Sequence, residues 1–213
     1  MRKIAQLLLL ALPIVCVSCG PKAKFLAPDY SKPDNIAILP TVNQTIDVKG
    51  GIVFRNLFYL ELQKKKTYTI VNNEMVDSLL NENGITDGGQ LKTTTNEELC
   101  NILKTDGLIY VDLIECKYQS IGISETRKIK VNLKLYTRTN RLLWEDERKV
   151  DHGKSAASSI FGAVLNPTGA LKKAGSDLVE QNVVKGLKGW LLDHELKPEM
   201  DEVVQITVKT LPK

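Results

Sequence analysis

Apolar residues recur along this chain with two different periods, and the order of the periods indicates an α/β domain. In the first half, short apolar runs alternate with longer segments in which apolar side chains repeat every three or four residues. The runs are typical of buried strands and the longer segments of amphipathic helices. The elements expected in this half are strands at 36–39 and 68–71 and helices at 52–64, 72–82 and 97–104. This strand–helix–strand order favours parallel pairing of the strands.

The second half is predicted to be antiparallel. Residues 108–118 form a long apolar strand, and residues 125–138 alternate apolar and polar side chains, as in a strand with one face in water. Thr139 and Asn140 form a tight turn, after which residues 141–150 return as a third strand. The whole pattern predicts a single α/β domain, whose mixed parallel and antiparallel sheet of about five strands is flanked by helices.

Two further elements are expected near the end of the chain. Apolar residues repeat at helical spacing over 176–193, which predicts a helix. Over 202–210, apolar residues alternate with polar ones, which favours an edge strand. We therefore expect the α/β domain to span residues 34–193 and the tail, residues 194–213, to add a strand at the edge of the sheet.

The start of the chain resembles the export signal of a bacterial lipoprotein. Arg2 and Lys3 precede an apolar run of roughly 12 residues, which is shorter than the ~20 needed to span a bilayer but typical of a signal peptide. The small residue Ser18 then stands before Cys19, as in a lipobox. One departure is Cys16, which occupies a position where a lipobox usually has Leu.

This signal predicts where the protein is found. Residues 1–18 are expected to be removed, Cys19 to carry acyl chains that anchor the protein, and residues 19–33, rich in Pro and Lys, to form an extended tether. Gly20 follows the cysteine in place of the Asp that marks inner-membrane retention, which favours the periplasmic face of the outer membrane. The alternative is an ordinary signal peptide with an incidental cysteine.

Charge and cysteine positions narrow the class of protein further. The chain has 213 residues and a net charge of +4, of which the signal peptide takes away two charges. That balance argues against nucleic-acid binding, which calls for a strongly basic face. Of the cysteines left after maturation, Cys100 is expected on a helix and Cys116 at the far end of a strand, too far apart for a disulfide. Both are predicted to be buried free thiols.

With these elements assigned, the sequence resembles a known family of bacterial lipoproteins. The resemblance rests on residues 32–43, which are Lys-Pro-Asp-Asn-Ile-Ala-Ile-Leu-Pro-Thr-Val-Asn, and on residues 108–111 and 143–145. It covers about residues 31–193. The family has no established function and includes a neisserial vaccine-candidate lipoprotein. Thr41, where a second proline is expected, departs from the family pattern, and the tail does not match it.

The resemblance implies an outer-membrane lipoprotein that can form a homodimer. Its fold is expected to be similar to the N-terminal domain of the Tol system's propeller protein and to the periplasmic domain of the curli secretion lipoprotein. Envelope proteins, among them a curli-secretion-like lipoprotein, are the implied partners, in envelope assembly or export. The family pattern contains no catalytic residues. The alternatives are an oligomeric secretion-pore-like subunit, against which the lack of two long amphipathic hairpins counts, and a periplasmic small-ligand-binding protein.

Candidate sites were sought among the polar residues and loops. His152 and His194 have no cysteine or carboxylate at ligand spacing along the chain, so both are predicted to be solvated and no metal or cofactor is expected. Gly50 and Gly51 lack the spacing of a phosphate-binding loop, which favours a simple helix start. Residues 41–49 still follow a parallel strand, where α/β folds tend to place binding surfaces.

The segment 156–171 is the predicted partner-binding region, because it combines small residues with apolar ones. Its apolar members are Ile160, Phe161, Val164 and Leu165. The alternative is a loop that folds back on the sheet. The sequence thus predicts a non-enzymatic lipoprotein that binds the membrane through the lipid on Cys19 and binds protein partners through this segment.

Overall fold

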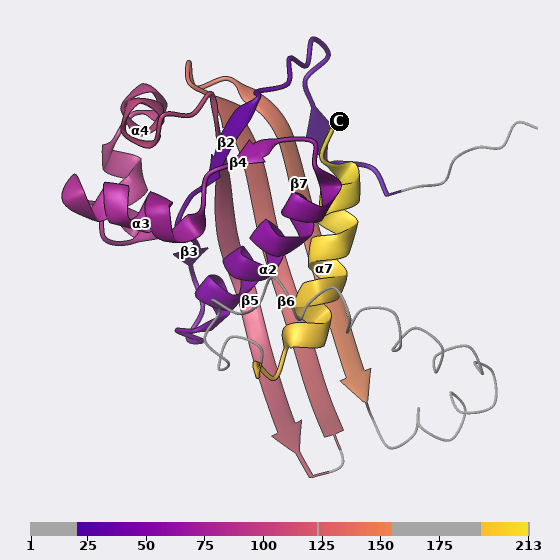
Figure 1. Cartoon of the computed structure of the whole chain (residues 1–213). Helices are drawn as coiled ribbons and strands as arrows, with labels where there is room; N and C mark the ends of the chain where they lie inside the picture. The colour runs from indigo at the N-terminus through magenta and orange to yellow at the C-terminus, as the bar shows by residue number, and fades with distance from the viewer. Residues whose placement is uncertain (1–20, 123, 155–192, 213) are drawn as a thin grey trace, which may run out of the picture.

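A mixed sheet forms the centre of the computed structural model, which describes residues 21–122, 124–154 and 193–212 (Figure 1). Seven strands are ordered β1-β7-β6-β5-β2-β4, and β3 pairs with β5 beyond the end of β2. The strands are β1 (Phe25–Leu26), β2 (Asn35–Ile38), β3 (Val42–Asn43), β4 (Thr69–Ile70), β5 (Gly107–Ile121), β6 (Ser124–Thr137) and β7 (Leu142–Lys154). The helices are α2 (Gly50–Lys65), α3 (Asn73–Glu82), the 3-10 helix η1 (Gly88–Thr93), α4 (Asn96–Leu103) and α7 (Lys197–Thr210).

The mixed sheet of the prediction is confirmed, with one correction to its size. Strands β4, β2, β3 and the start of β5 pair in parallel, whereas β5, β6, β7 and β1 pair antiparallel. The sheet has seven strands and not about five. The added strands β1 and β3 pair over two residues each, too few for an alternating pattern to mark them in the sequence.

Helices cover the two faces of the sheet unequally. α2 and α7 lie side by side across one face and bury the larger core, which includes Phe54, Trp144 and Met200 (Figure 1). α3 and α4 lie against the parallel half on the opposite face, over a smaller core that includes Leu39 and Leu99. The rest of that second face is polar: lysines of β6 pair with carboxylates of β7 across it.

The predicted edge strand in the tail is wrong, because these residues form α7. Val204 and Val208 do alternate with polar residues, but they also belong to a set that repeats every three or four residues with Met200, Val203 and Leu211. All five side chains are buried against α2 and the sheet. Packing against that apolar surface favours the helical period, because it buries the whole set at once.

The predicted tether also differs from the structure in its described part. Phe25 and Leu26 pair with β7, and the Ala27 N–H donates to the Leu143 carbonyl at 2.9 Å. Ala27 is buried, so ordered chain begins before residue 34. The predicted signal peptide, the helix over 176–193 and the segment 156–171 lie outside the described residues.

Candidate functional site

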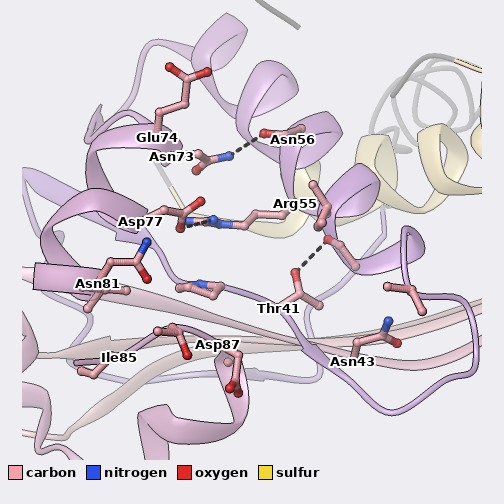
Figure 2. A pocket seen from close by; sticks show the side chains of 17 residues that line it. Thr41, Asn43, Arg55, Asn56, Asn73, Glu74, Asp77, Asn81, Ile85 and Asp87 are labelled. Atoms are coloured by element: carbon pink, nitrogen blue, oxygen red, sulfur yellow. Dashed lines mark hydrogen bonds and ion pairs between the residues drawn. The ribbon is translucent and has the colours of Figure 1, made fainter. Parts of the chain in front are cut away.

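A cavity of about 520 Å³ opens at the carboxyl end of β2, where the sequence placed a binding loop (Figure 2). Its walls come from the β2–α2 connection, the start of α2, α3 and the turn before η1. The Thr41 hydroxyl donates to the Gly51 carbonyl at 3.0 Å and holds the connection against α2. At Gly88 a Cβ would lie 2.6 Å from the Thr41 carbonyl oxygen, so only glycine allows this close approach of the two backbones.

Arg55 of α2 is the buried charge beside this cavity. Its Nε and Nη2 donate to the Ile38 carbonyl at 3.0 and 2.7 Å, and its Nη1 donates to Asp77 Oδ1 at 2.6 Å. Burial lowers the pKa of Arg55, and the Asp77 carboxylate opposes that lowering. The guanidinium therefore stays charged, caps the carboxyl end of β2 and neutralises Asp77 (Figure 2).

The remaining polar groups give the cavity an acidic character. Glu74 and Asp87 line it together with Asp77, and Arg55 is the cation among the lining residues that the structure describes. Three carboxylates against one guanidinium leave an excess of two negative charges. Asn73, 6% exposed, donates its Nδ2 to Asn56 Oδ1 at 3.0 Å, while its own Oδ1 has no hydrogen-bond partner among the described residues.

The loop of residues 44–49, which we call the Ile46 loop, borders the cavity and is held by hydrogen bonds. Asn43 Oδ1 accepts from the Thr45 N–H at 3.0 Å and from its hydroxyl at 2.8 Å, and Asn43 Nδ2 donates to the Asp47 carbonyl at 2.6 Å. Even so, Ile46 is 99% exposed and Val48 is 82% exposed. The loop therefore holds two β-branched apolar side chains in water on a fixed backbone.

Asp47 connects this loop to two distant parts of the chain. Its Oδ1 accepts the N–H groups of Lys49 and Gly50 at 3.1 and 3.0 Å, so it caps the start of α2. Its Oδ2 lies 2.7 Å from His194 Nε2 and accepts the Cys116 thiol at 3.2 Å. His194 Nδ1 accepts the Leu196 N–H at 3.1 Å, so the neutral ring has its hydrogen on Nε2 and donates to Asp47.

The prediction that His194 is a solvated side chain is therefore wrong, because it contacts Asp47 and lies close to Cys116. Both partners are far away in sequence, and no spacing along the chain could have indicated them. Cys116 reaches Asp47 because a register shift in β5 between Leu113 and Glu115 turns it to the face that Leu113 occupies. His152 is exposed as predicted, although its ring nitrogens lie 3.7 Å from a Glu199 oxygen and 3.4 Å from a Glu202 oxygen.

The donor atoms of Asp47, Cys116 and His194 lie within 4.8 Å of one another, which is close enough for a shared metal ion. The hydrogen positions argue against one. A histidine that binds metal usually donates its other ring N–H to an acceptor, whereas His194 Nδ1 accepts a hydrogen bond. Burial raises the pKa of Cys116, and Asp47 raises it further, so in the metal-free protein the thiol keeps its proton and donates to Asp47. We conclude that the three residues form a hydrogen-bonded tie.

The remaining predicted residues divide into two groups. Cys100 and Cys116 are both free and buried, which confirms the prediction for the thiols. Cys19 and the four partner-binding candidates Ile160, Phe161, Val164 and Leu165 lie outside the described residues, and their roles stay predictions. The residues that form the cavity, chiefly Arg55, Asn73 and Asp77, were missed, because their helical pattern gives no sign of which polar positions meet.

Comparison with known proteins assigns this chain to a family. A family model described as "Putative lipoprotein GNA1162-like" matches residues 25–180. The chain belongs to this family. The match spans most of the chain, including β1 to β7, and confirms the resemblance noted in the sequence. No helix in the described part of this family member has the length and apolar character needed to cross a membrane.

Individual relatives agree with this assignment. "Putative lipoprotein NMB1124/NMB1162" of Neisseria meningitidis serogroup B is 24% identical over 162 residues, which cover 74% of this chain and 74% of the relative. The crystal structure of lipoprotein GNA1162 from Neisseria meningitidis matches with a TM-score of 0.53 at 18% identity, covering 63% of this chain and 96% of that chain. That likeness shows a shared fold. A PelC dodecamer from Paraburkholderia phytofirmans matches with a TM-score of 0.44 at 12% identity, covering 64% of this chain and 86% of that chain.

Proposed function

We propose that this protein is a non-enzymatic lipoprotein of the outer membrane that binds other envelope proteins during assembly or export. Acyl chains on Cys19 would anchor it, with the folded domain on the periplasmic side. Membership of a lipoprotein family supports the anchor, as does the lipobox-like sequence around Cys19. Anchoring keeps a binding domain at the membrane surface, where its partners are concentrated.

One observation supports partner binding above all: the Ile46 loop exposes Ile46 and Val48 on a backbone that its own hydrogen bonds hold in place. Exposed apolar side chains grouped on one surface are typical of protein-binding sites. A loop that is already ordered loses little conformational entropy on binding, which favours affinity. The Ile46 loop therefore has the two properties that a docking surface needs.

The polar groups nearby favour binding over catalysis. Arg55 is occupied by the Ile38 carbonyl and Asp77, and Asp47 accepts hydrogen bonds from both sides of its carboxylate. A general base needs a free lone pair near the reacting proton, and a nucleophilic cysteine needs a lowered pKa. Both carboxylate oxygens of Asp47 already accept hydrogen bonds, and burial raises the pKa of the Cys116 thiol, so neither residue suits these roles.

The proposal is tested by chemical crosslinking in cells followed by purification of the full-length lipoprotein. We expect a second envelope protein to be recovered with the wild type. It should be lost with Cys19→Ala, which removes the anchor, and with the double variant Ile46→Asp and Val48→Asp. Ile121→Asp, a matched change at another exposed apolar residue, should leave recovery unchanged. Recovery of this protein alone in all cases would overturn the accessory role and indicate a homo-oligomer.

A further inference from the structure

The cavity and the Ile46 loop form one continuous surface with an apolar and an acidic part. Val48 and Ile52 line the cavity and are also 82% and 50% exposed, so the apolar part extends from the loop onto the start of α2. Glu74 of α3 and Asp87 of the turn before η1 also line the cavity, and both are exposed (Figure 2). A partner that fills this surface must therefore offer apolar and polar groups side by side.

The charge of the cavity specifies the polar group. Arg55 and Asp77 neutralise each other through their 2.6 Å contact, which leaves the carboxylates of Glu74 and Asp87 without a cation among the lining residues described. A positive group entering the cavity would compensate them, and a negative group would be repelled. Glu74 and Asp87 are both exposed, so water and salt screen this preference and its size should fall as the salt concentration rises.

Asn73 independently points to a hydrogen-bond donor as the ligand group. Its Oδ1 is an acceptor without a partner in the described structure, and its side chain is 6% exposed and lines the cavity. Buried polar atoms are nearly always satisfied, so this oxygen, which the surrounding side chains cover, would accept from a donor group that displaces them. The ammonium of lysine and the guanidinium of arginine are such groups, and both are positively charged.

We infer that the cavity binds the lysine or arginine side chain of a partner protein segment whose neighbouring apolar residue packs on Ile46, Val48 and Ile52. The inference rests on the proposed function and adds the chemistry of the partner. The occupant is a chain segment of a second envelope protein with an apolar and a basic residue next to each other. A cavity of about 520 Å³ has room for one long side chain together with part of its backbone.

The test places a photo-crosslinking amino acid at Asn81 of the full-length lipoprotein. Asn81 lines the cavity and is exposed, so the probe reaches the occupant while the apolar and acidic residues stay intact (Figure 2). After irradiation of cells, mass spectrometry identifies the crosslinked peptide. We expect a segment of another envelope protein in which Lys or Arg stands within two positions of an apolar residue. The same probe at Thr139, in the exposed turn between β6 and β7, should not capture it.

Charge reversal then separates this inference from the proposed function. Glu74→Lys with Asp87→Lys should reduce the crosslink about tenfold, because the cavity becomes positive. Asp34→Lys with Glu97→Lys, an equal change of charge at exposed positions outside the cavity, should leave the yield unchanged. A crosslink that survives the cavity reversal but is lost with Ile46→Asp would overturn the inference and leave the proposed function intact. Capture of this chain itself, or no capture, would also overturn it.

Discussion

Replacement of Asp47 by alanine should destabilise the fold, because one carboxylate joins three parts of the chain. Asp47 accepts from the Lys49 and Gly50 N–H groups, the Cys116 thiol and His194 Nε2. Water can replace the bond to exposed Lys49, and the thiol is a weak donor. About two well-formed bonds remain, and because the Asp47 side chain is 27% exposed, water screens them to about 1–1.5 kcal/mol each, below the range for a buried charged acceptor. We therefore expect Asp47→Ala to lower the free energy of unfolding by about 2–3 kcal/mol.

Urea unfolding followed by far-UV circular dichroism measures this loss. With a slope of about 2 kcal/mol per M urea, the midpoint should fall by about 1 M. Asp151→Ala is the matched control: the Asp151 side chain is 40% exposed and pairs with Lys128 and Lys149, so the change should stay within about 0.5 kcal/mol. Equal midpoints for the two variants would refute the claim that Asp47 ties the loop to β5 and the C-terminal helix.

The same residue predicts a pH dependence. Burial raises the pKa of Asp47, but hydrogen bonds from Cys116 and His194 outweigh burial and hold the pKa below its usual value. A lowered folded-state pKa means that the ionised carboxylate stabilises the fold above the unfolded pKa of about 3.9. This contribution is lost as the pH falls through the folded-state value. The difference in free energy of unfolding between wild type and Asp47→Asn should thus be largest at pH 7 and smaller near pH 3. A difference that does not change with pH would contradict the lowered pKa of Asp47.

Three further predictions follow from other parts of the fold. Arg55→Ala should lower the free energy of unfolding, measured in urea, by about 2 kcal/mol, because the Ile38 carbonyl and Asp77 lose their hydrogen-bond donor. A change within about 0.5 kcal/mol would contradict the buried role of Arg55. Gln205→Pro should lower the free energy of unfolding by about 3 kcal/mol, because proline breaks α7, whereas Gln205→Ala should leave it unchanged. If proline leaves the stability unchanged, the residues form an edge strand and not a helix. In the mature lipoprotein, Cys100 and Cys116 should react with Ellman's reagent about a hundredfold more slowly than in urea, since burial raises the pKa of both thiols; equal rates would show that they are exposed.

The sequence predicted the fold well where a segment is long enough for its period to be visible. The helix predicted at 52–64 corresponds to α2, and the alternating residues 125–138 correspond to β6. It failed where two periods coincide, as in residues 202–210, whose valines fit both a strand and a helix. Two-residue strands such as β1 and β3 are decided by the neighbouring strand they pair with, so no pattern of their own could reveal them.

The sequence indicated where the cavity lies, but not which side chains line it. The rule that α/β folds place binding surfaces after parallel strands indicated residues 41–49, and these residues do border the cavity. The chemistry of the cavity depends on Arg55, Asn73 and Asp87, which three separate elements bring together. They are well separated along the chain, and each one alone is typical of a solvated helix or turn.

The sequence by itself therefore indicated the lipoprotein family, the mixed sheet and the loop that borders the cavity, because these depend on local period, composition and short motifs. Tertiary structure alone decided that the tail is a helix, that His194 meets Asp47 and Cys116, and that acidic and apolar groups share one cavity. The physical reason is that each of these depends on contacts between distant segments. A register shift in β5 turns Cys116 toward Asp47. Packing against the apolar surface of α2 and the sheet favours a helix over a strand for the residues of α7.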